Sequence, residues 1–156
     1  MPNPQPIPQS ELGADWQELL SAALKARELA YAPYSHFPVG AAVRTRTGRI
    51  FSGCNIENAS SGLTVCAERV AIWKAVSEGE RALVALAVVT EPGATPCGAC
   101  RQVMSEFESD LPVLIADTAG HAWLTSLGDL MPLPFPRVHL GSKQPNAPRT
   151  EKGCTR

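Results

Sequence analysis

The sequence has no long apolar run, no excess of charge of one sign and no export signal. None of its apolar stretches approaches the roughly 20 residues that a membrane span requires, which excludes an integral membrane protein. The opening MPNPQPIPQS has neither a basic region nor an apolar core, so we expect no signal peptide and a cytoplasmic location. The 14 basic and 15 acidic residues are scattered, and the formal net charge is -1. We therefore expect no nucleic-acid partner and predict a small molecule instead.

Cysteine is present in an odd number, which argues against a framework of disulfide bonds in a chain without an export signal. Metal binding and redox chemistry are then the two roles to weigh for these side chains. The five cysteines are Cys54, Cys66, Cys97, Cys100 and Cys154.

The length and composition predict one globular domain. With 156 residues, 44% of them hydrophobic, the chain can bury one core but is too short for two ordinary domains. Four prolines in the first eight residues, and a polar stretch at the other end, cannot bury enough apolar surface to become ordered. We therefore expect a flexible segment at 1–11, a folded domain at 12–140 and a flexible tail at 141–156.

The hydrophobic pattern alternates between helices and strands. Apolar residues recur at three- and four-residue steps over 15–31, which is typical of an amphipathic helix, whereas the continuous apolar run at 82–90 indicates a central strand buried on both faces. Thr95 and Pro96 are typical of a helix start. This interleaving predicts an α/β fold, a three-layer α/β/α sandwich with a mixed, five-stranded sheet. The expected elements are helices at 15–31, 66–76 and 96–108 and strands at 39–44, 49–54, 82–90, 111–116 and 121–124.

Three cysteines lie at two of the predicted helix starts. Cys97 and Cys100 are three residues apart, so their sulfur atoms share one face of a first helical turn, where free backbone amides favour thiolates. Cys66 precedes Glu68 by two residues, which places Cys66 at the helix cap, before the first full turn. If the two helix starts meet, three thiolates can hold one Zn²⁺ and leave the fourth tetrahedral position for water. Glu68 would then lie beside that water and move its proton.

Three thiolates carry more negative charge than one Zn²⁺ neutralises, so such a site needs nearby positive charge. Arg69 and the two helix N-termini are the candidate sources. Two other interpretations stay open for the cysteines. The CGAC segment is also typical of a redox pair, and a closed structural zinc site would need a fourth ligand from Cys54, His36, His121 or His139. The third cysteine, with a glutamate two residues on, favours the open catalytic site.

The segments CAER and PCGACRQV, preceded by YAPYSHFPVGAA and GCNIENAS, resemble the small homotetrameric cytidine deaminases over roughly residues 15–135. Zinc deaminases share the plan of a histidine or cysteine ligand, a glutamate two residues on and a later PCxxC. The resemblance implies that 12–140 is a catalytic domain with one Zn²⁺ per subunit, in a homotetramer. It also implies the hydrolysis of free cytidine and 2'-deoxycytidine to uridine and 2'-deoxyuridine in pyrimidine salvage.

The same resemblance assigns roles to residues outside the zinc motif. It implies that Asn55 and Glu57 bind the ribose 3'-hydroxyl, that Phe37 packs against the nucleoside and that the Ala67 backbone holds the base. Phe135 matches a phenylalanine that the family lends to a neighbouring subunit's site. By default these would be ordinary core, turn or solvated residues.

One position departs from the family pattern. Where many relatives carry an aromatic residue after NIENA, as in NIENAxY, this chain has Ser61 in NIENASSG. The change removes a ring near the ribose end, and it keeps open an alternative substrate, a modified cytosine nucleoside or nucleoside antibiotic. A polynucleotide-editing deaminase is disfavoured, because those enzymes resemble HxE at the first ligand and basic residues are not clustered here.

Overall fold

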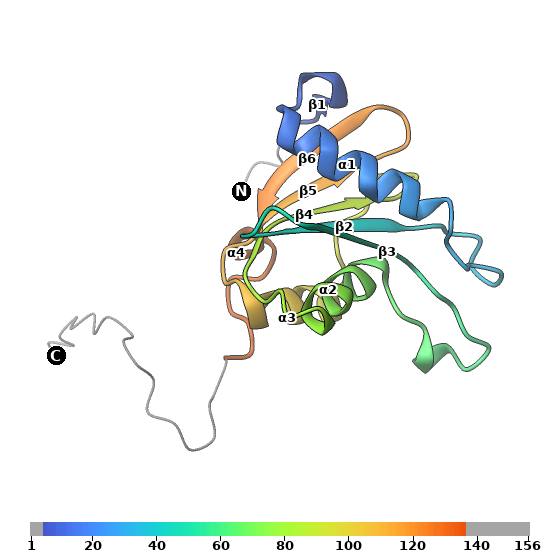
Figure 1. Cartoon of the computed structure of the whole chain (residues 1–156). Helices are drawn as coiled ribbons and strands as arrows, with labels where there is room; N and C mark the ends of the chain where they lie inside the picture. Colours follow the sequence, from blue (N-terminus) through green and yellow to red (C-terminus); the bar gives the residue numbers. More distant parts are fainter. Residues whose placement is uncertain (1–4, 137–156) are drawn as a thin grey trace, which may run out of the picture.

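The computed structural model describes residues 5–136 and places a six-stranded mixed sheet between two layers of helix (Figure 1). The strand order is β1-β6-β5-β4-β2-β3, with β4 and β5 parallel and every other pair antiparallel. The central position of β4 is as predicted. The strands are β1 (Ile7–Pro8), β2 (Gly40–Thr45), β3 (Ile50–Cys54), β4 (Leu83–Val89), β5 (Pro112–Ala116) and β6 (His121–Ser126).

One long helix covers one face of the sheet and two helices cover the other, which confirms the three-layer α/β/α sandwich (Figure 1). The helix α1 (Ala14–Arg27) packs on one side, and α2 (Ala67–Ser77) and α3 (Gly98–Phe107) pack on the opposite side. The short elements are α4 (Leu127–Leu130) and the 3-10 turns η1 (Gln9–Glu11) and η2 (Ser61–Leu63). Among residues 5–136, no helix has both the length and the hydropathy of a membrane span.

The sheet divides the core into two clusters, because successive side chains of a strand point to opposite faces. Along β4, Leu86 and Val88 face α2 and α3, whereas Ala87 and Val89 face α1. All four side chains are at most 1% exposed, which confirms a strand buried on both faces in this part of β4.

Two glycines let the helices lie directly on the sheet. A Cβ added to Gly40 would lie 2.0 Å from the Ala23 carbonyl oxygen in α1. A Cβ added to Gly53 would lie 2.7 Å from the Ala67 carbonyl oxygen and 2.6 Å from the Ala71 nitrogen in α2. Glycine is required at such close approaches of two backbones. Gly53 thereby sets the position of the first turn of α2.

The prediction of five strands is wrong by one, because the first residues of the described chain add an edge strand. Ile7 pairs with Ala122 of β6, and the Gln9 backbone N–H donates to the Gly120 carbonyl at 2.8 Å. Proline has no backbone N–H to donate to a neighbouring strand. Pro8 is tolerated because β1 is an edge strand, which has a partner strand on one side only. Residues 7–11, which the sequence analysis places in the flexible segment 1–11, thus contact the sheet. Residues 137–140 and the tail 141–156 lie outside the described residues.

A second correction concerns the start of α3. The helix begins at Gly98 with Cys97 as its N-cap, so Thr95 and Pro96 precede it instead of forming its first turn. A third is α4, which the sequence analysis did not include. Its N-cap Ser126 accepts a hydrogen bond from the Asp129 backbone N–H at 3.3 Å.

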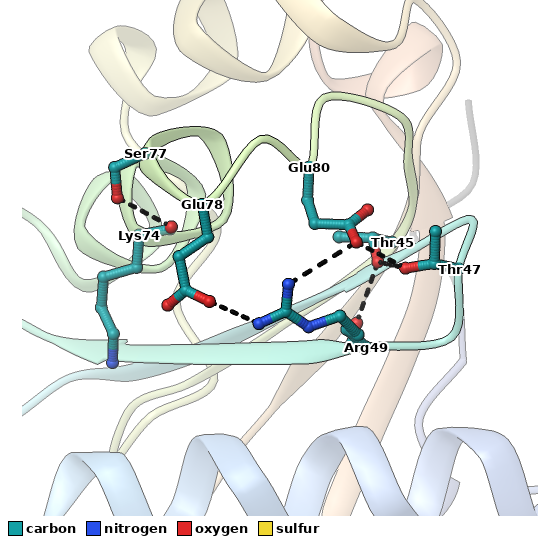
Figure 2. A network of polar contacts seen from close by, with 7 residues as sticks. All are labelled: Thr45, Thr47, Arg49, Lys74, Ser77, Glu78 and Glu80. Carbon is teal, nitrogen blue, oxygen red and sulfur yellow. Dashed lines mark hydrogen bonds and ion pairs between the residues drawn. The ribbon is translucent and has the colours of Figure 1, made fainter.

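A surface network holds the end of α2 that lies away from its cysteine (Figure 2). Arg49, directly before β3, pairs with Glu78 and, at 3.7 Å, with Glu80. The Thr47 hydroxyl also donates to Glu80, at 2.8 Å. Because Arg49 is half-exposed, each ion pair contributes on the order of 0 to 1 kcal/mol. The network links the β2–β3 turn to the connection between α2 and β4.

Candidate metal centre and active site

The N-terminal ends of α2 and α3 bring three cysteines together. Cys66 is the N-cap of α2, as predicted, Cys97 is the N-cap of α3, and Cys100 lies in the first turn of α3. The Cys66 and Cys97 sulfur atoms are 3.7 Å apart, and those of Cys97 and Cys100 are 3.5 Å apart. All three sulfur atoms lie within 4.8 Å of one another.

This geometry fits a tetrahedral zinc ion. Zn–S bonds of about 2.3 Å at tetrahedral angles place two sulfur atoms about 3.8 Å apart, close to the distances observed. Within residues 5–136, no fourth histidine, cysteine or carboxylate completes the group. Cys54, His36 and His121 are therefore not ligands here, and His139 and Cys154 lie outside the described residues. Three protein ligands leave one coordination position for water or substrate, which favours a catalytic site over a structural one.

The three thiols differ in their readiness to ionise. Hydrogen bonds from the Cys100 thiol and from Arg69 lower the pKa of Cys66 to about 5. The hydrogen bond to Cys66 and burial raise the pKa of Cys100. One thiolate therefore forms easily in this cluster, while a second negative charge beside it needs compensation by a cation. A bound Zn²⁺ supplies that compensation.

Arg69 lies against Cys66 and supplies the positive charge that such a cluster is expected to need. Its Nη2 atom is 3.6 Å from the Cys66 sulfur and 3.4 Å from the Thr64 carbonyl oxygen. The guanidinium carbon lies 5.7 Å from the centroid of the Trp73 ring, so a cation–π contact fixes the other side of the side chain. The Arg69 charge thus faces the Cys66 sulfur.

Glu68 is the second residue of α2 and points away from solvent. Only 3% of it is exposed, although it lines the same cavity as Cys66 and Cys97. Burial is the main cause that raises its pKa above the ordinary glutamate value. A raised pKa favours the protonated form of the carboxyl group, which suits a residue that accepts and returns a proton as a general base and acid.

A cavity of about 380 Å³ opens next to the cysteines. Cys66, Cys97 and Glu68 form one end, which we call the cysteine end, and the connections 28–39 and 55–65 form the other. These two connections lie at the same end of the sheet (Figure 1) and are joined by a backbone bridge between Tyr31 and Ile56. The lining residues are Ser35, Phe37, Val39, Asn55, Glu57, Thr64, Val65, Cys66, Glu68, Thr95 and Cys97.

Asn55 and Glu57 line the cavity, and each also holds the connection 28–39 in place. The Asn55 side chain accepts from the Val39 N–H at 2.8 Å and donates to the Phe37 carbonyl at 2.9 Å. The Glu57 carboxylate accepts from the Tyr34 N–H at 2.9 Å and from the Ser35 hydroxyl. Hydrogen bonds from the Ser35 hydroxyl and the Tyr34 backbone lower the pKa of Glu57, so it is ionised at neutral pH.

Three further residues that the resemblance singles out have different surroundings. Phe37 lines the cavity and is partly exposed. Ala67 is fully buried as the first residue of α2 and is not among the residues that line the cavity. Phe135 is 75% exposed and does not line the cavity of its own chain. Its backbone N–H and carbonyl pair with the Gln102 side chain at 3.0 and 3.1 Å.

The structure adds a residue that the sequence analysis did not single out. The Arg101 guanidinium of α3 donates to the Pro96 carbonyl at 2.7 Å, to the Leu130 carbonyl at 2.7 Å and to the Thr95 hydroxyl at 3.0 Å. It therefore ties the residues before Cys97 to the end of α4. Its sequence signal is its position directly after Cys100, which does not reveal the Leu130 carbonyl as a partner.

An open set of three thiolates beside a buried carboxylate defines a metal-dependent hydrolytic enzyme as the class of protein. Residues 14–115 match the model of the cytidine and deoxycytidylate deaminase zinc-binding region. The chain is 48% identical over 129 residues to a cytidine deaminase of Sporosarcina psychrophila, covering 81% of this chain and 95% of that protein. The chain belongs to the family of cytidine and deoxycytidylate deaminases with this zinc-binding region.

Solved structures and a more distant relative agree with this assignment. The crystal structure of cytidine deaminase from Burkholderia pseudomallei superposes with a TM-score of 0.74 at 50% identity, covering 76% of this chain and 98% of that one. A blasticidin-S deaminase of Bacillus cereus is 35% identical over 130 residues, covering 77% of this chain and 91% of that protein. Both the fold and the enzyme family predicted from the motifs are thereby confirmed.

Proposed function

We propose that this protein hydrolyses the exocyclic amine of free cytidine and 2'-deoxycytidine, giving uridine or 2'-deoxyuridine and ammonia. The observation that carries the proposal is the placement of buried Glu68 at the cysteine end of a nucleoside-sized cavity. Cavities of this kind, about 300 to 1,000 Å³, enclose small ligands. The match to cytidine deaminases over most of the chain supports the same substrate.

Cys66, Cys97 and Cys100 would hold the Zn²⁺, which when bound lowers the pKa of a water molecule and so provides the nucleophile. Glu68 would take one proton from the attacking water molecule as its oxygen adds to C4 of the cytosine ring, and would pass this proton to N3. Glu68 would then take the remaining proton from the hydroxyl now on C4 and deliver it to the amine at C4. The C4–N bond breaks, ammonia leaves, and a carbonyl remains at C4. Arg69 faces the Cys66 sulfur and offsets part of the thiolate charge throughout.

The remaining lining residues bind the nucleoside. The Ala67 backbone holds the base near Glu68, and Phe37 packs against the nucleoside. Asn55 and Glu57 hydrogen bond to the ribose 3'-hydroxyl, using lone pairs and protons that the connection 28–39 leaves available. Because these two side chains also hold that connection, they shape the site before the substrate arrives.

We also propose a homotetramer with one Zn²⁺ per subunit, in which Phe135 reaches a neighbouring subunit's cavity. The 75% exposure of Phe135, and the 93% exposure of nearby Leu133, support this proposal, since large apolar side chains seldom remain in water without a partner. Free cytidine and 2'-deoxycytidine as substrates also support a cytoplasmic role in pyrimidine salvage.

The decisive experiment combines zinc analysis with ammonia release from cytidine for Glu68→Gln. We expect the variant to bind zinc and fold normally, while kcat falls by about 10² to 10⁴, because glutamine cannot carry the proton. Glu28→Gln, at an exposed position outside the cavity, is the matched control and should keep full activity. Undiminished turnover by the Glu68 variant would remove this residue from the mechanism.

A further inference from the structure

One residue of the connection 28–39 has a backbone conformation that most side chains disfavour. His36 has a φ of 54°, and within residues 5–136 it is the one residue other than glycine with a positive φ. In this left-handed region the Cβ atom comes too close to the following carbonyl oxygen. Histidine and asparagine are found there more often than most residues, and β-branched residues hardly ever. Such a conformation persists only where the surrounding structure imposes it, and it occurs preferentially at active and binding sites.

The contacts that impose this conformation lie on both sides of His36 in the chain. Directly before it, the Ser35 N–H and hydroxyl both donate to the Glu57 carboxylate, the N–H at 3.2 Å. Directly after it, the Phe37 carbonyl accepts from the Asn55 side chain at 2.9 Å. The chain must therefore change direction at His36 if both of these side chains are to keep their hydrogen bonds.

The neighbouring residues leave this change of direction to His36. Its own N–H closes a turn by donating to the Ala32 carbonyl at 3.1 Å. Phe37 is followed by Pro38, and a proline disfavours the helical region for the residue before it, so Phe37 favours an extended conformation. Pro38 has a fixed φ, and its carbonyl accepts from the Arg27 side chain at 3.1 Å. The segment on either side of His36 is thus held, and the left-handed residue joins the two parts.

The His36 side chain is exposed and is not among the residues that line the cavity, whereas Ser35 and Phe37 both line it. What His36 contributes to the cavity is therefore the conformation of its backbone. If the φ of this residue moved out of the left-handed region, the chain could not keep Ser35 on Glu57 and the Phe37 carbonyl on Asn55 at the same time. The cavity end opposite the cysteines would then lose its shape.

We propose that His36 is a positioning residue, whose left-handed backbone holds Asn55 and Glu57 in the orientation that binds the ribose 3'-hydroxyl. This inference rests on the proposed function and adds to it a residue that acts through the path of the chain. It follows that position 36 accepts any residue that adopts a positive φ, whatever its side chain does. Glycine and asparagine meet this requirement, alanine meets it at a cost, and valine does not.

The test measures kcat and KM for cytidine with zinc-loaded variants of this position. We expect His36→Gly and His36→Asn to keep KM within about threefold of the wild-type value, although glycine removes the whole side chain. His36→Ala should raise KM by about three- to tenfold and His36→Val by at least about tenfold, with kcat changed less than about threefold, because Glu68 is held by α2. Ser60→Val is the control, since this exposed residue has a φ of −82°, which valine adopts readily.

A second substrate, 3'-deoxycytidine, separates positioning of the ribose-binding groups from a general loss of structure. The wild-type enzyme should prefer cytidine by at least about tenfold in kcat/KM, because the substrate without the hydroxyl leaves Asn55 and Glu57 unpaired. In His36→Val we expect this preference to fall at least about fivefold, since 3'-deoxycytidine has no such contact to lose. A variant that merely folds less well loses both substrates equally and keeps the preference. If His36→Val yields no folded protein, His36→Ala gives the same comparison, with a fall of at least about twofold.

Each contrary outcome has a distinct meaning. A KM for His36→Gly as high as that for His36→Val would overturn the proposal, because the imidazole would then matter and not the backbone. A wild-type KM in the valine variant, an unchanged preference between the two substrates, or a wild-type enzyme without that preference would overturn it as well, and would leave cytidine deamination standing. If the zinc-loaded wild-type enzyme deaminates no cytidine, the proposed function itself fails, and this inference fails with it.

Discussion

The cysteine end of the cavity lies on two helix N-termini. The opposite end, where the proposed function places the ribose and which we call the sugar end, is formed by the connections 28–39 and 55–65, which are hydrogen bonded to each other. At the cysteine end, Cys100 is fully buried and Glu68 is 3% exposed, and both belong to helices packed on the sheet. At the sugar end, Ser35 and Glu57 lie near solvent and depend on mutual hydrogen bonds. Groups that transfer protons need a fixed geometry. Groups that bind and select a substrate lie more often on surface connections, whose conformation can adjust to the substrate. The following experiments test this division.

The largest effect on activity should come from removing the metal, because the residues of the cysteine end act by binding the metal or by acting beside it. Dialysis against a chelator should lower cytidine deamination by at least about a thousandfold, since no nucleophile forms at neutral pH without the ion. Stoichiometric Zn²⁺ should restore activity in step with metal content measured on the same samples. Full activity in protein verified as metal-free would contradict the assignment of the three cysteines as zinc ligands.

Gly53→Ala should displace the first turn of α2 and thereby disturb the cysteine end. The added methyl group would lie 2.6 Å from the Ala71 nitrogen and 2.7 Å from the Ala67 carbonyl oxygen, so α2 must move outward and carry Cys66 with it. We expect a loss of about 1 to 3 kcal/mol in the free energy of unfolding, measured with urea, together with weaker zinc retention. Gly62→Ala, where the methyl group meets nothing within 4 Å, is the control. Equal stability of both variants would mean that α2 is not seated on Gly53.

Arg101→Ala should act on the cysteine end without touching the metal. Loss of three hydrogen bonds frees the residues before Cys97 and leaves the Pro96 and Leu130 carbonyls without this partner, so we expect kcat to fall by about tenfold and zinc to dissociate faster in a chelator competition. Arg46→Ala removes an exposed arginine elsewhere on the surface and should change neither quantity. A change in KM alone would place Arg101 with the sugar end instead.

Ser35→Ala should give the smallest effect and should confine it to the sugar end. The variant removes the hydroxyl that donates to Glu57 and accepts from the Phe37 N–H at 3.1 Å, so the connection 28–39 loosens around the ribose. We expect KM for cytidine to rise by about three- to tenfold with little change in kcat, measured by steady-state ammonia release. A fall in kcat with unchanged KM would show that the two ends of the cavity are not separable.

The cysteine end could be predicted in detail from the sequence because its signals are local. The spacing of Cys97 and Cys100, and the offset between Cys66 and Glu68, follow from the geometry of a helix start. The structure has Cys66 and Cys97 at the N-caps of α2 and α3. The residues of the sugar end could be predicted only through the family resemblance. The spacing of Ser35 and Glu57 does not indicate that these residues, 22 positions apart, form a hydrogen bond.

The errors in the predicted fold have the same origin. Prolines near the N-terminus argued against order, yet Ile7 pairs with Ala122, more than a hundred residues along the chain. Thr95 and Pro96 have the composition of a helix start, but the Arg101 side chain binds the Pro96 carbonyl and the Thr95 hydroxyl, and the helix begins later. In the first case a partner far along the chain, and in the second a side chain one helical turn further on, outweighed the local preference that composition and periodicity describe.

The sequence by itself determined the alternation of strands and helices, the cysteines and glutamate at the helix starts, and the family to which the chain belongs. These properties depend on residues that lie within one or two helical turns of one another along the chain, so the order of residues is enough to predict them. The tertiary structure alone decided that Cys66 meets Cys97, that Arg101 binds the Leu130 carbonyl, and that Ser35 meets Glu57. Those relations depend on how α2 and α3 pack on one sheet and on how the connections 28–39 and 55–65 meet at its end, and only the folded chain brings such distant residues into contact.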